Sequence, residues 1–146
     1  MTTEARSVRP FHLAMPCVDV VATTKFYHEV LGCTLGRSAP TWQDFDFFGH
    51  QLVFHQAPAG FELGQVRNSV DAHDVPIPHF GVVLTPEDWE KLSQRLTEHQ
   101  VKFEIAPQIR FKGLPGEQGI FFFFDPNGIA LEFKCFKSDD SLFAPQ

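Results

Sequence analysis

The 146-residue sequence has only three cysteines, and no two of them have the C-x-x-C spacing of a structural zinc site. Cys17, Cys33 and Cys135 are also odd in number, which argues against a disulfide framework. No group that could activate a thiolate is apparent near them in the sequence. We therefore expect all three to be small, buried, apolar side chains.

Basic clusters and long apolar segments are missing as well. No run of Lys or Arg exceeds two residues and the net charge is −6, so neither a nucleic-acid surface nor a polybasic membrane patch is indicated. No stretch of 18 apolar residues occurs, and the polar start of the chain, residues 1–10, lacks the apolar segment of a signal peptide. We expect a cytoplasmic protein without a nucleic-acid or membrane partner.

Tyrosine is nearly absent, whereas phenylalanine is abundant: the chain has one Tyr and 17 Phe. This composition indicates a strongly apolar interior, and the length fits a single domain. The densest aromatic segment, Phe121–Phe124, is typical of a strand that is buried on both faces. The turn residues Asp125-Pro126-Asn127-Gly128 follow directly, so we predict a hairpin there.

The second strand of this hairpin, residues 129–133, is apolar except for Glu132. A carboxylate in such a position costs several kcal/mol unless a cation compensates it. That cation is either an Arg or Lys side chain or a bound metal ion. Lys134 is an unfavoured partner, because side chains on the same face at a sheet edge are usually solvated.

Two histidines stand at the start of segments that have the character of strands. His12 lies in Phe11–Met15, and His79 begins residues 79–84. Two imidazoles and one carboxylate on three strands can form a facial metal site with open positions for water or substrate. The alternative for each histidine alone is a structural, hydrogen-bonded side chain.

The pattern of strand, helix and three further strands occurs twice, and His79 follows His12 by 67 residues (79 − 12 = 67). Asp19 is the expected N-cap of the first helix, residues 20–31, which Gly32 ends. The second helix begins at Thr85-Pro86. Pairing the last strand of each repeat puts Val53 opposite Glu132. The remaining strands are predicted at 33–35, 45–48, 50–55, 101–105 and 121–124. The segment 57–78 shows no sustained period and is predicted to connect the two halves, and 107–119 is predicted to be a long, turn-rich loop.

Several of these segments together resemble the vicinal oxygen chelate superfamily, which includes glyoxalases, extradiol dioxygenases and fosfomycin and bleomycin resistance proteins. The resemblance covers residues 11–136. The motifs that carry it are Phe11-His12-Leu13-Ala14-Met15-Pro16-Cys17-Val18-Asp19, Phe26-Tyr27-His28-Glu29-Val30-Leu31-Gly32-Cys33, His79-Phe80-Gly81-Val82 and Asp125-Pro126-Asn127-Gly128-Ile129-Ala130-Leu131-Glu132.

The resemblance implies an α+β fold of two βαβββ modules that form an eight-stranded curled sheet around a metal-binding cleft. Its expected parts are a lead-in (1–10), module one (11–56), a linker (57–78), module two (79–136) and a C-terminal tail (137–146). By matching position, the metal ligands are His12, His79 and Glu132. Family members are often dimers, some with modules exchanged between chains, so we expect a homodimer.

The fourth ligand of glyoxalases would fall at Val53, which cannot bind a metal. The chain therefore resembles the three-ligand branch, although a one-residue slip would bring Gln51 or His55 into that position. The donor set suits Fe(II), which we favour, and also Mn(II), Co(II), Ni(II) or Zn(II). Dioxygenase-like chemistry on a substrate with neighbouring oxygens is the leading expectation. The alternatives are a glyoxalase-like lyase or isomerase and a non-catalytic binding protein of the bleomycin-resistance type.

Further residues are candidates for contact with substrate. His55 is the candidate general acid or base, and it shares strand parity with Gln51, which would hydrogen-bond to substrate. Arg110 could clamp a carboxylate or phosphate. Phe122 and Phe124, or the alternate pair Phe121 and Phe123, would form an apolar wall. The alternatives are a hydrogen-bonded wall histidine, an arginine paired with Glu117 and phenylalanines that only fill the core.

Overall fold

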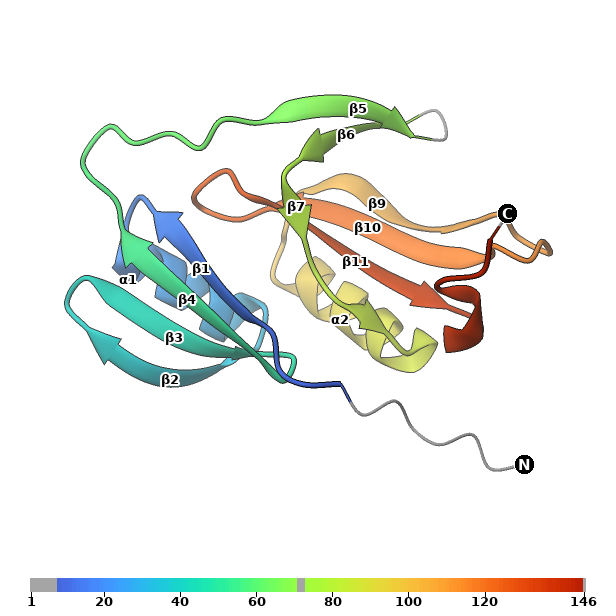
Figure 1. Ribbon diagram of the computed structural model, residues 1–146, viewed down its shortest axis with the longest axis horizontal. Helices are drawn as coiled ribbons and strands as arrows, with labels where there is room; N and C mark the ends of the chain where they lie inside the picture. The colour runs from blue at the N-terminus through green and yellow to red at the C-terminus, as the bar shows by residue number, and fades with distance from the viewer. Residues whose placement is uncertain (1–7, 71–72, 146) are drawn as a thin grey trace.

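The computed structural model of the chain describes residues 8–70 and 73–145. Module one forms a four-stranded sheet of order β1-β4-β3-β2, with a helix on one face (Figure 1). Its elements are β1 (His12–Cys17), α1 (Val20–Lys25), the π-helical continuation η1 (Phe26–Val30), β2 (Thr34–Ala39), β3 (Trp42–Phe47) and β4 (His50–Gln56).

Module two repeats this order in a sheet of order β7-β11-β10-β9, in which β8 also pairs with β11. Its elements are β7 (His79–Phe80), β8 (Val83–Leu84), α2 (Pro86–Glu98), β9 (Phe103–Arg110), β10 (Gln118–Phe124) and β11 (Ala130–Phe136), followed by the short 3-10 helix η2 (Asp139–Ser141). The prediction of an α+β fold built from two βαβββ modules is confirmed. Within the described residues, the strands of the two modules belong to separate sheets whose inner edges are β1 and β7 (Figure 1).

The strand register confirms the alignment of the two repeats. His12 on β1 pairs with Gln51 on β4, and His79 on β7 pairs with Ala130 on β11, both in parallel. Val53 lies two residues after Gln51, and Glu132 lies two residues after Ala130. Val53 and Glu132 are therefore equivalent, and no one-residue slip brings another residue to that position.

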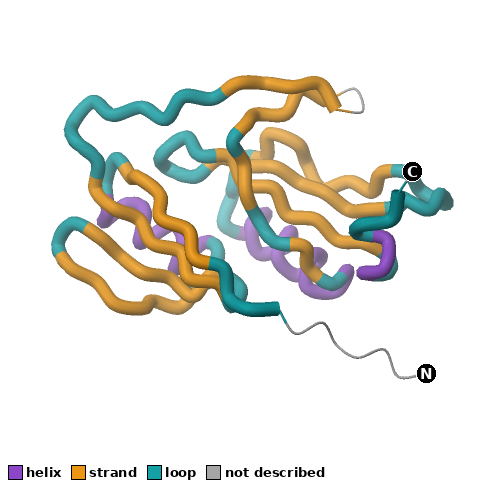
Figure 2. The backbone as a smooth tube through the Cα atoms, in the orientation of Figure 1, coloured by secondary structure: helices purple, strands orange, loops and turns teal. Residues whose placement is uncertain are grey.

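The segment 57–78 connects the two modules, but it also contains strands that we did not predict. It contains the hairpin of β5 (Val66–Val70) and β6 (His73–Ile77) (Figure 2). Val75 packs with buried residues of the second sheet. All residues of β5 are exposed, so the strand has no alternation of apolar and polar residues that sequence reasoning could detect.

Two strands continue through prolines beyond the predicted strand segments 11–15 and 101–105. Pro16 lies inside β1, and Pro107 lies inside β9, which runs on to Arg110 and shortens the predicted loop of 107–119. Both strands are sheet edges, where a residue without an N–H group is tolerated.

One hydrophobic core serves both modules. The helices lie on the same face of the sheets as this core, and the stacked rings of Phe121, Phe123 and Phe133 lie within it. The predicted helix starts are confirmed: Asp19 accepts hydrogen bonds from the first-turn N–H groups of α1, and Thr85 does so for α2. Alternate residues of each strand therefore face the helices, and the intervening ones face the opposite side.

The predicted turn after β10 also fastens the two modules together. Asp125 is buried and accepts hydrogen bonds from the N–H groups of Asn127 and Ile129 and from the hydroxyl of Tyr27 in module one, at 2.8, 2.9 and 2.8 Å respectively. The side-chain oxygen of Asn127 accepts from the N–H of Val18 at 2.8 Å. The orientation of module one relative to the second sheet therefore depends on this turn.

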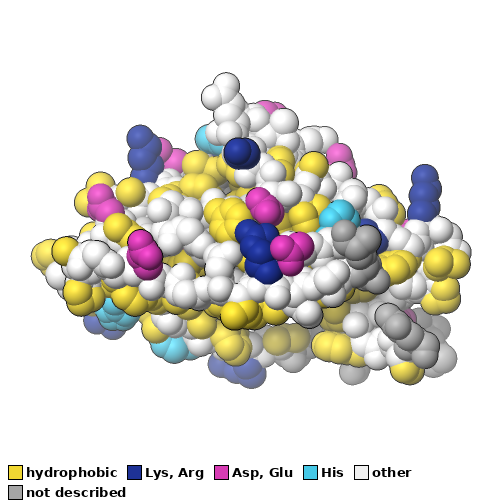
Figure 3. Space-filling model, turned by 90° about the horizontal axis from the view of Figure 1, so that it is seen from above, with side chains coloured by type: hydrophobic (Ala, Val, Ile, Leu, Met, Phe, Trp, Pro, Cys, Tyr) yellow, Lys and Arg dark blue, Asp and Glu magenta, His cyan; other side chains and the backbone are white. Residues whose placement is uncertain are grey.

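The surface carries no single dominant charge on the face that Figure 3 shows. Acidic and basic side chains are interspersed there with hydrophobic ones. Among the described residues, no helix has both the length and the apolar character needed to cross a membrane.

Candidate metal centre

Module two brings two of the three predicted ligands together. The Nε2 atom of His79 on β7 lies 3.8 Å from Oε2 of Glu132 on β11. This approach depends on Gly81, because a Cβ atom there would lie only 1.6 Å from the backbone oxygen of Glu132. We call His79, Glu132 and the neighbouring Lys134 the second half-site.

The hydrogen bond of His79 leaves one ring nitrogen available. Its Nδ1 lies 2.7 Å from the carbonyl oxygen of Pro76. A carbonyl oxygen can only accept, so Nδ1 carries a proton, and in the neutral imidazole the lone pair is on Nε2, the nitrogen that lies beside Glu132. Most metal-binding histidines are held by a hydrogen bond of this kind from the second ring nitrogen.

Contrary to our expectation, Lys134 is a partner of Glu132. Its Nζ lies 3.1 Å from Oε1 of Glu132, whose side chain is 9% exposed, against 40% for Lys134. Lys134 lies two residues further along β11 and therefore on the same face, and β8 covers this strand, so the edge that we assumed is absent. The carboxylate thus has a cation beside one oxygen and an imidazole beside the other.

Replacing Lys134 with Met should strengthen metal binding. The lysine competes for Oε1, and an ion pair with such an exposed partner is worth at most roughly 1 kcal/mol, so the affinity should rise by up to about fivefold. Isothermal titration with Mn(II) would measure this change, with Lys91→Met, which breaks the exposed pair with Glu87, as the control. A weaker affinity in Lys134→Met than in the control would contradict the competition.

The third predicted ligand, His12, lies in module one. We call His12, Gln51 and Asp44 the first half-site. Nδ1 of His12 is 3.0 Å from Oε1 of Gln51, and Nε2 of Gln51 donates to Oδ2 of Asp44 at 3.3 Å. His12 therefore also holds its proton on Nδ1 and has Nε2 available. Val53, which is 5% exposed, occupies the position equivalent to Glu132 and supplies no ligand.

A single chain does not assemble the three-ligand site. In the part of the chain that the structure describes, no group of three or more His, Cys, Asp and Glu side chains lies close enough to hold a metal ion. The donors themselves fit a transition metal, because both imidazoles have an available Nε2 and the carboxylate is nearly buried. The assignment of His12, His79 and Glu132 stays a prediction that requires the two half-sites to meet.

The predicted aromatic wall divides between the two faces of β10. Phe122 pairs with Glu132 in the register, and its ring centroid lies 4.9 Å from that of His79. Phe124 shares this face and is half-buried. Phe121 and Phe123, the alternate pair, lie in the core on the helix side.

The remaining predicted contacts lie further along the strands. His55 pairs with Pro16, four residues beyond the pairing of His12 with Gln51, which corresponds to about 13 Å along the strand. Its ring centroid is 6.4 Å from that of Trp42. Arg110 ends β9 and lies over the ring of Phe111 at 5.4 Å. Arg110 pairs with Gln118, which pairs with Phe136, four residues beyond Glu132 on β11, so both side chains are placed away from the predicted ligands.

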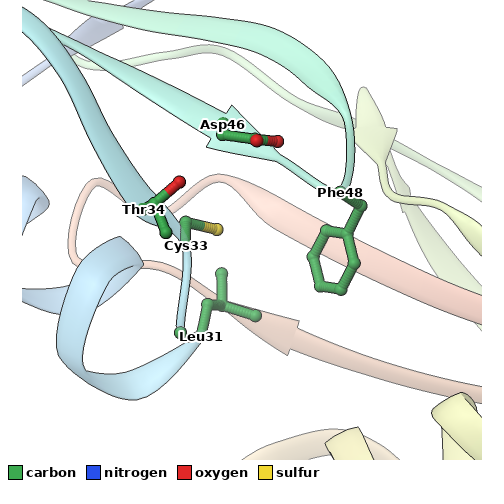
Figure 4. A pocket seen from close by; sticks show the side chains of 6 residues that line it. Leu31, Cys33, Thr34, Asp46 and Phe48 are labelled. Atoms are coloured by element: carbon green, nitrogen blue, oxygen red, sulfur yellow. The ribbon is translucent and has the colours of Figure 1, made fainter.

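A cavity of about 230 Å³ lies between the end of the first helix, β2 and β3 (Figure 4). It contains Cys33, whose pKa is raised to about 12 by burial, so this thiol is not a nucleophile at neutral pH. All three cysteines are buried and unpaired, as predicted. A second cavity, of about 290 Å³, is lined by Leu13 and Phe80, each next in the chain to a predicted histidine ligand.

Sequence reasoning missed Asp44 and discounted Lys134. Asp44 shares strand parity with Asp46 and Trp42, and it pairs with Val53 across β3 and β4. Once β3 and β4 are placed side by side, this parity puts Asp44 on the same face as Gln51. The two-residue spacing of Trp42, Asp44 and Asp46 was visible in the sequence, but only the pairing of β3 with β4 shows which face these residues share.

Comparison with known proteins agrees with this architecture. A glutathione transferase FosA from Serratia marcescens is 28% identical over 121 residues, which are 83% of this chain and 76% of that protein. A crystal structure of a glyoxalase/bleomycin resistance protein/dioxygenase from Alicyclobacillus acidocaldarius is 31% identical, with a TM-score of 0.73 over 92% of this chain and 96% of that one. The fosfomycin resistance protein FosX from Listeria monocytogenes shares the fold, with 14% identity and a TM-score of 0.64 over 97% of this chain and 98% of that one.

The family model described as Glyoxalase/Bleomycin resistance protein/Dioxygenase superfamily matches residues 9–133, which include the three predicted metal ligands. The repeat, the register and the two half-sites are features of this chain that were described independently of the match. The chain belongs to the glyoxalase/bleomycin resistance protein/dioxygenase superfamily.

Proposed function

We propose that the chain is a metal-dependent enzyme in which His12, His79 and Glu132 hold one divalent transition ion and a small substrate binds through neighbouring oxygens. The hydrogen bonding of the two imidazoles is the observation that supports this most. Each donates from Nδ1 to an oxygen and keeps Nε2 available. Two nitrogens and one carboxylate suit Fe(II), Mn(II), Co(II), Ni(II) or Zn(II) and leave coordination positions open.

We further propose that a second copy of the chain completes the site. Each chain has one copy of each half-site, and the face of module one that carries His12 is exposed around Ala14. In a dimer with twofold symmetry, the first half-site of one chain can meet the second half-site of the other, and the symmetry then creates two equal sites. The expected homodimer and the expected ligand set thus support one another.

When bound, the metal would act as a Lewis acid that stabilises negative charge on the substrate oxygens. Glu132 supplies the anionic donor, and the ring of Phe122 packs edge-on against that of His79. His55 and Arg110 lie too far from the ligands to act on a metal-bound atom, so we assign them to the outer part of a substrate. The distance favours contact with substrate for His55 over proton transfer.

Mixing two inactive variants tests the shared site. His12→Ala and Glu132→Ala each remove a ligand from every site of their own homodimer. A mixed dimer regains one intact site, so random re-association should restore roughly a quarter of the wild-type metal sites. Elemental analysis of the refolded mixture would count them. Recovery of no sites from a mixture that forms mixed dimers would contradict a site shared between chains.

Two reaction classes compete for this site. The relative named as a glutathione transferase favours addition of glutathione, through its sulfur, to a metal-bound substrate. The His, His and carboxylate donor set instead suits Fe(II) and dioxygenase-like chemistry. Because the chain aligns with most of the length of that relative, we place group transfer first and dioxygenase-like chemistry second.

A panel of metals and substrates separates these classes. Consumption of glutathione in the presence of fosfomycin and Mn(II) would support group transfer, whereas oxygen uptake with catechols after anaerobic loading with Fe(II) would support a dioxygenase. Turnover of a hemithioacetal with Ni(II), Co(II) or Zn(II) would support a lyase. Protein purified without a stoichiometric metal, with ligand binding that survives His12→Ala, would instead identify a binding protein.

A further inference from the structure

Four strands of module one carry a continuous row of residues that ends at His12. Gly36 on β2 lies beside Asp44 on β3. Asp44 accepts a hydrogen bond from the side chain of Gln51 on β4, and Gln51 in turn is hydrogen-bonded to His12 on β1. A Cβ atom at Gly36 would lie 3.1 Å from the Cβ of Asp44, so the glycine leaves room for the carboxylate to take its place in the row.

The carboxylate determines how the amide of Gln51 is oriented. Oδ2 of Asp44 can only accept, so the Nε2 group of Gln51 faces it at 3.3 Å. Oε1 of Gln51 must then face His12, and it accepts from Nδ1 at 3.0 Å. The proton of the neutral imidazole is thereby held on Nδ1, and Nε2 keeps the lone pair that a metal requires.

His79 is held in a different manner. Its Nδ1 donates to the backbone oxygen of Pro76, an acceptor that no side-chain substitution removes. His12 has no such backbone partner among its described hydrogen bonds and depends on two side chains in series. The two imidazoles of the proposed site therefore differ in how easily their tautomer can change.

We propose that Gln51 and Asp44 are positioning residues, which fix the tautomer and orientation of His12 without touching the metal. This role rests on the proposed function, and it replaces the contact with substrate that the sequence suggested for Gln51. Asp44 acts only through Gln51, because it contacts the amide and not the imidazole. The affinity of the site for a divalent ion then depends on a carboxylate two side chains away from it.

Asp44→Asn is the direct test, because it keeps the shape of the side chain and removes the requirement for Gln51 to donate. The amide of Gln51 can then reverse and present its NH₂ group to His12, which favours the proton on Nε2. We expect the Nδ1-protonated fraction of His12 to fall in Asp44→Asn and in Gln51→Leu. Nitrogen-15 NMR of the metal-free protein, assigned with His12→Gln, measures this fraction.

Binding of Mn(II) provides the second readout. Loss of a partner that orients a metal ligand typically costs about 10- to 100-fold in affinity, which is the fall that we expect in Asp44→Asn. Asp46→Asn is the matched control: it lies on the same strand and face and loses the same charge, but its carboxylate accepts from the N–H of Gly49 and not from Gln51. The affinity of the control should stay within about threefold of wild type, a change below 1 kcal/mol.

The two readouts separate this inference from the proposed function. An unchanged tautomer in Asp44→Asn, or equal losses of affinity in Asp44→Asn and Asp46→Asn, would overturn the positioning role. Wild-type protein that binds no Mn(II) would overturn the proposed function instead. A shifted tautomer in that case would still support the relay from Asp44 to His12.

Discussion

Replacing Glu132 with Gln is expected to remove metal binding while the fold stays intact. The substitution keeps the size of a side chain that is only 9% exposed, but it replaces the anionic donor with a neutral amide. The affinity should fall by more than the roughly 100-fold that marks the upper end for losing an outer-shell partner, because Glu132 is a proposed ligand itself. Titration of the metal-stripped protein with Mn(II) measures the loss.

Stability should change little in the same variant. Glu132→Gln loses an ion pair with a lysine that is 40% exposed, a contribution of roughly 0–1 kcal/mol, and it also relieves the cost of burying a carboxylate. Glu87→Gln, which breaks an equally short but exposed pair with Lys91, is the matched control. Stoichiometric metal in Glu132→Gln at wild-type affinity would exclude Glu132 as a ligand.

Replacing Asp125 with Ala is expected to give a large loss of stability. Asp125 is 5% exposed, and its carboxylate accepts from two backbone N–H groups and from the buried hydroxyl of Tyr27. Alanine leaves these donors without an acceptor in the interior, which should lower the free energy of unfolding by about 3–5 kcal/mol. Urea denaturation of the metal-free protein would measure the change.

The pH dependence gives an internal check on this turn. Burial raises the pKa of Asp125, although the hydrogen bonds from Ile129, Tyr27 and Asn127 oppose the rise. The folded pKa thus lies above the unfolded one, so the contribution of this carboxyl group is most favourable below the unfolded pKa and decreases as the pH rises through the folded pKa. Asp125→Asn should therefore cost more stability at low pH than at pH 7.

A loss below 1 kcal/mol in the free energy of unfolding of Asp125→Ala would show that the turn does not join the modules.

Local features of the chain were predictable because their causes lie within a few residues. Asp19 and Thr85 cap the helices where the sequence placed them, and Gly32 ends the first helix with a positive φ of 83°. The spacing of His12 and His79 and the equivalence of Val53 and Glu132 followed from the internal repeat. A repeat is visible in a sequence because each copy must build the same strand and helix pattern.

Features that depend on neighbours distant in sequence were missed. The hairpin of β5 and β6 has no internal alternation and takes its place by packing Val75 against the second sheet. The pairing of Lys134 with Glu132 required β8 to cover the strand that we had treated as an edge. In both cases the contacts that decide the structure join segments far apart in the sequence, which the pattern of neighbouring residues cannot show.

The sequence by itself determined the two-module α+β architecture, the family and the residue types proposed for the metal site. Only the tertiary structure decided that His79 and Glu132 meet within one chain while His12 lies in a separate half-site with Gln51 and Asp44. The physical reason is that side-chain types and strand periodicity are local properties, whereas the distance between two sheet faces depends on how Tyr27, Asp125 and the shared core join the modules.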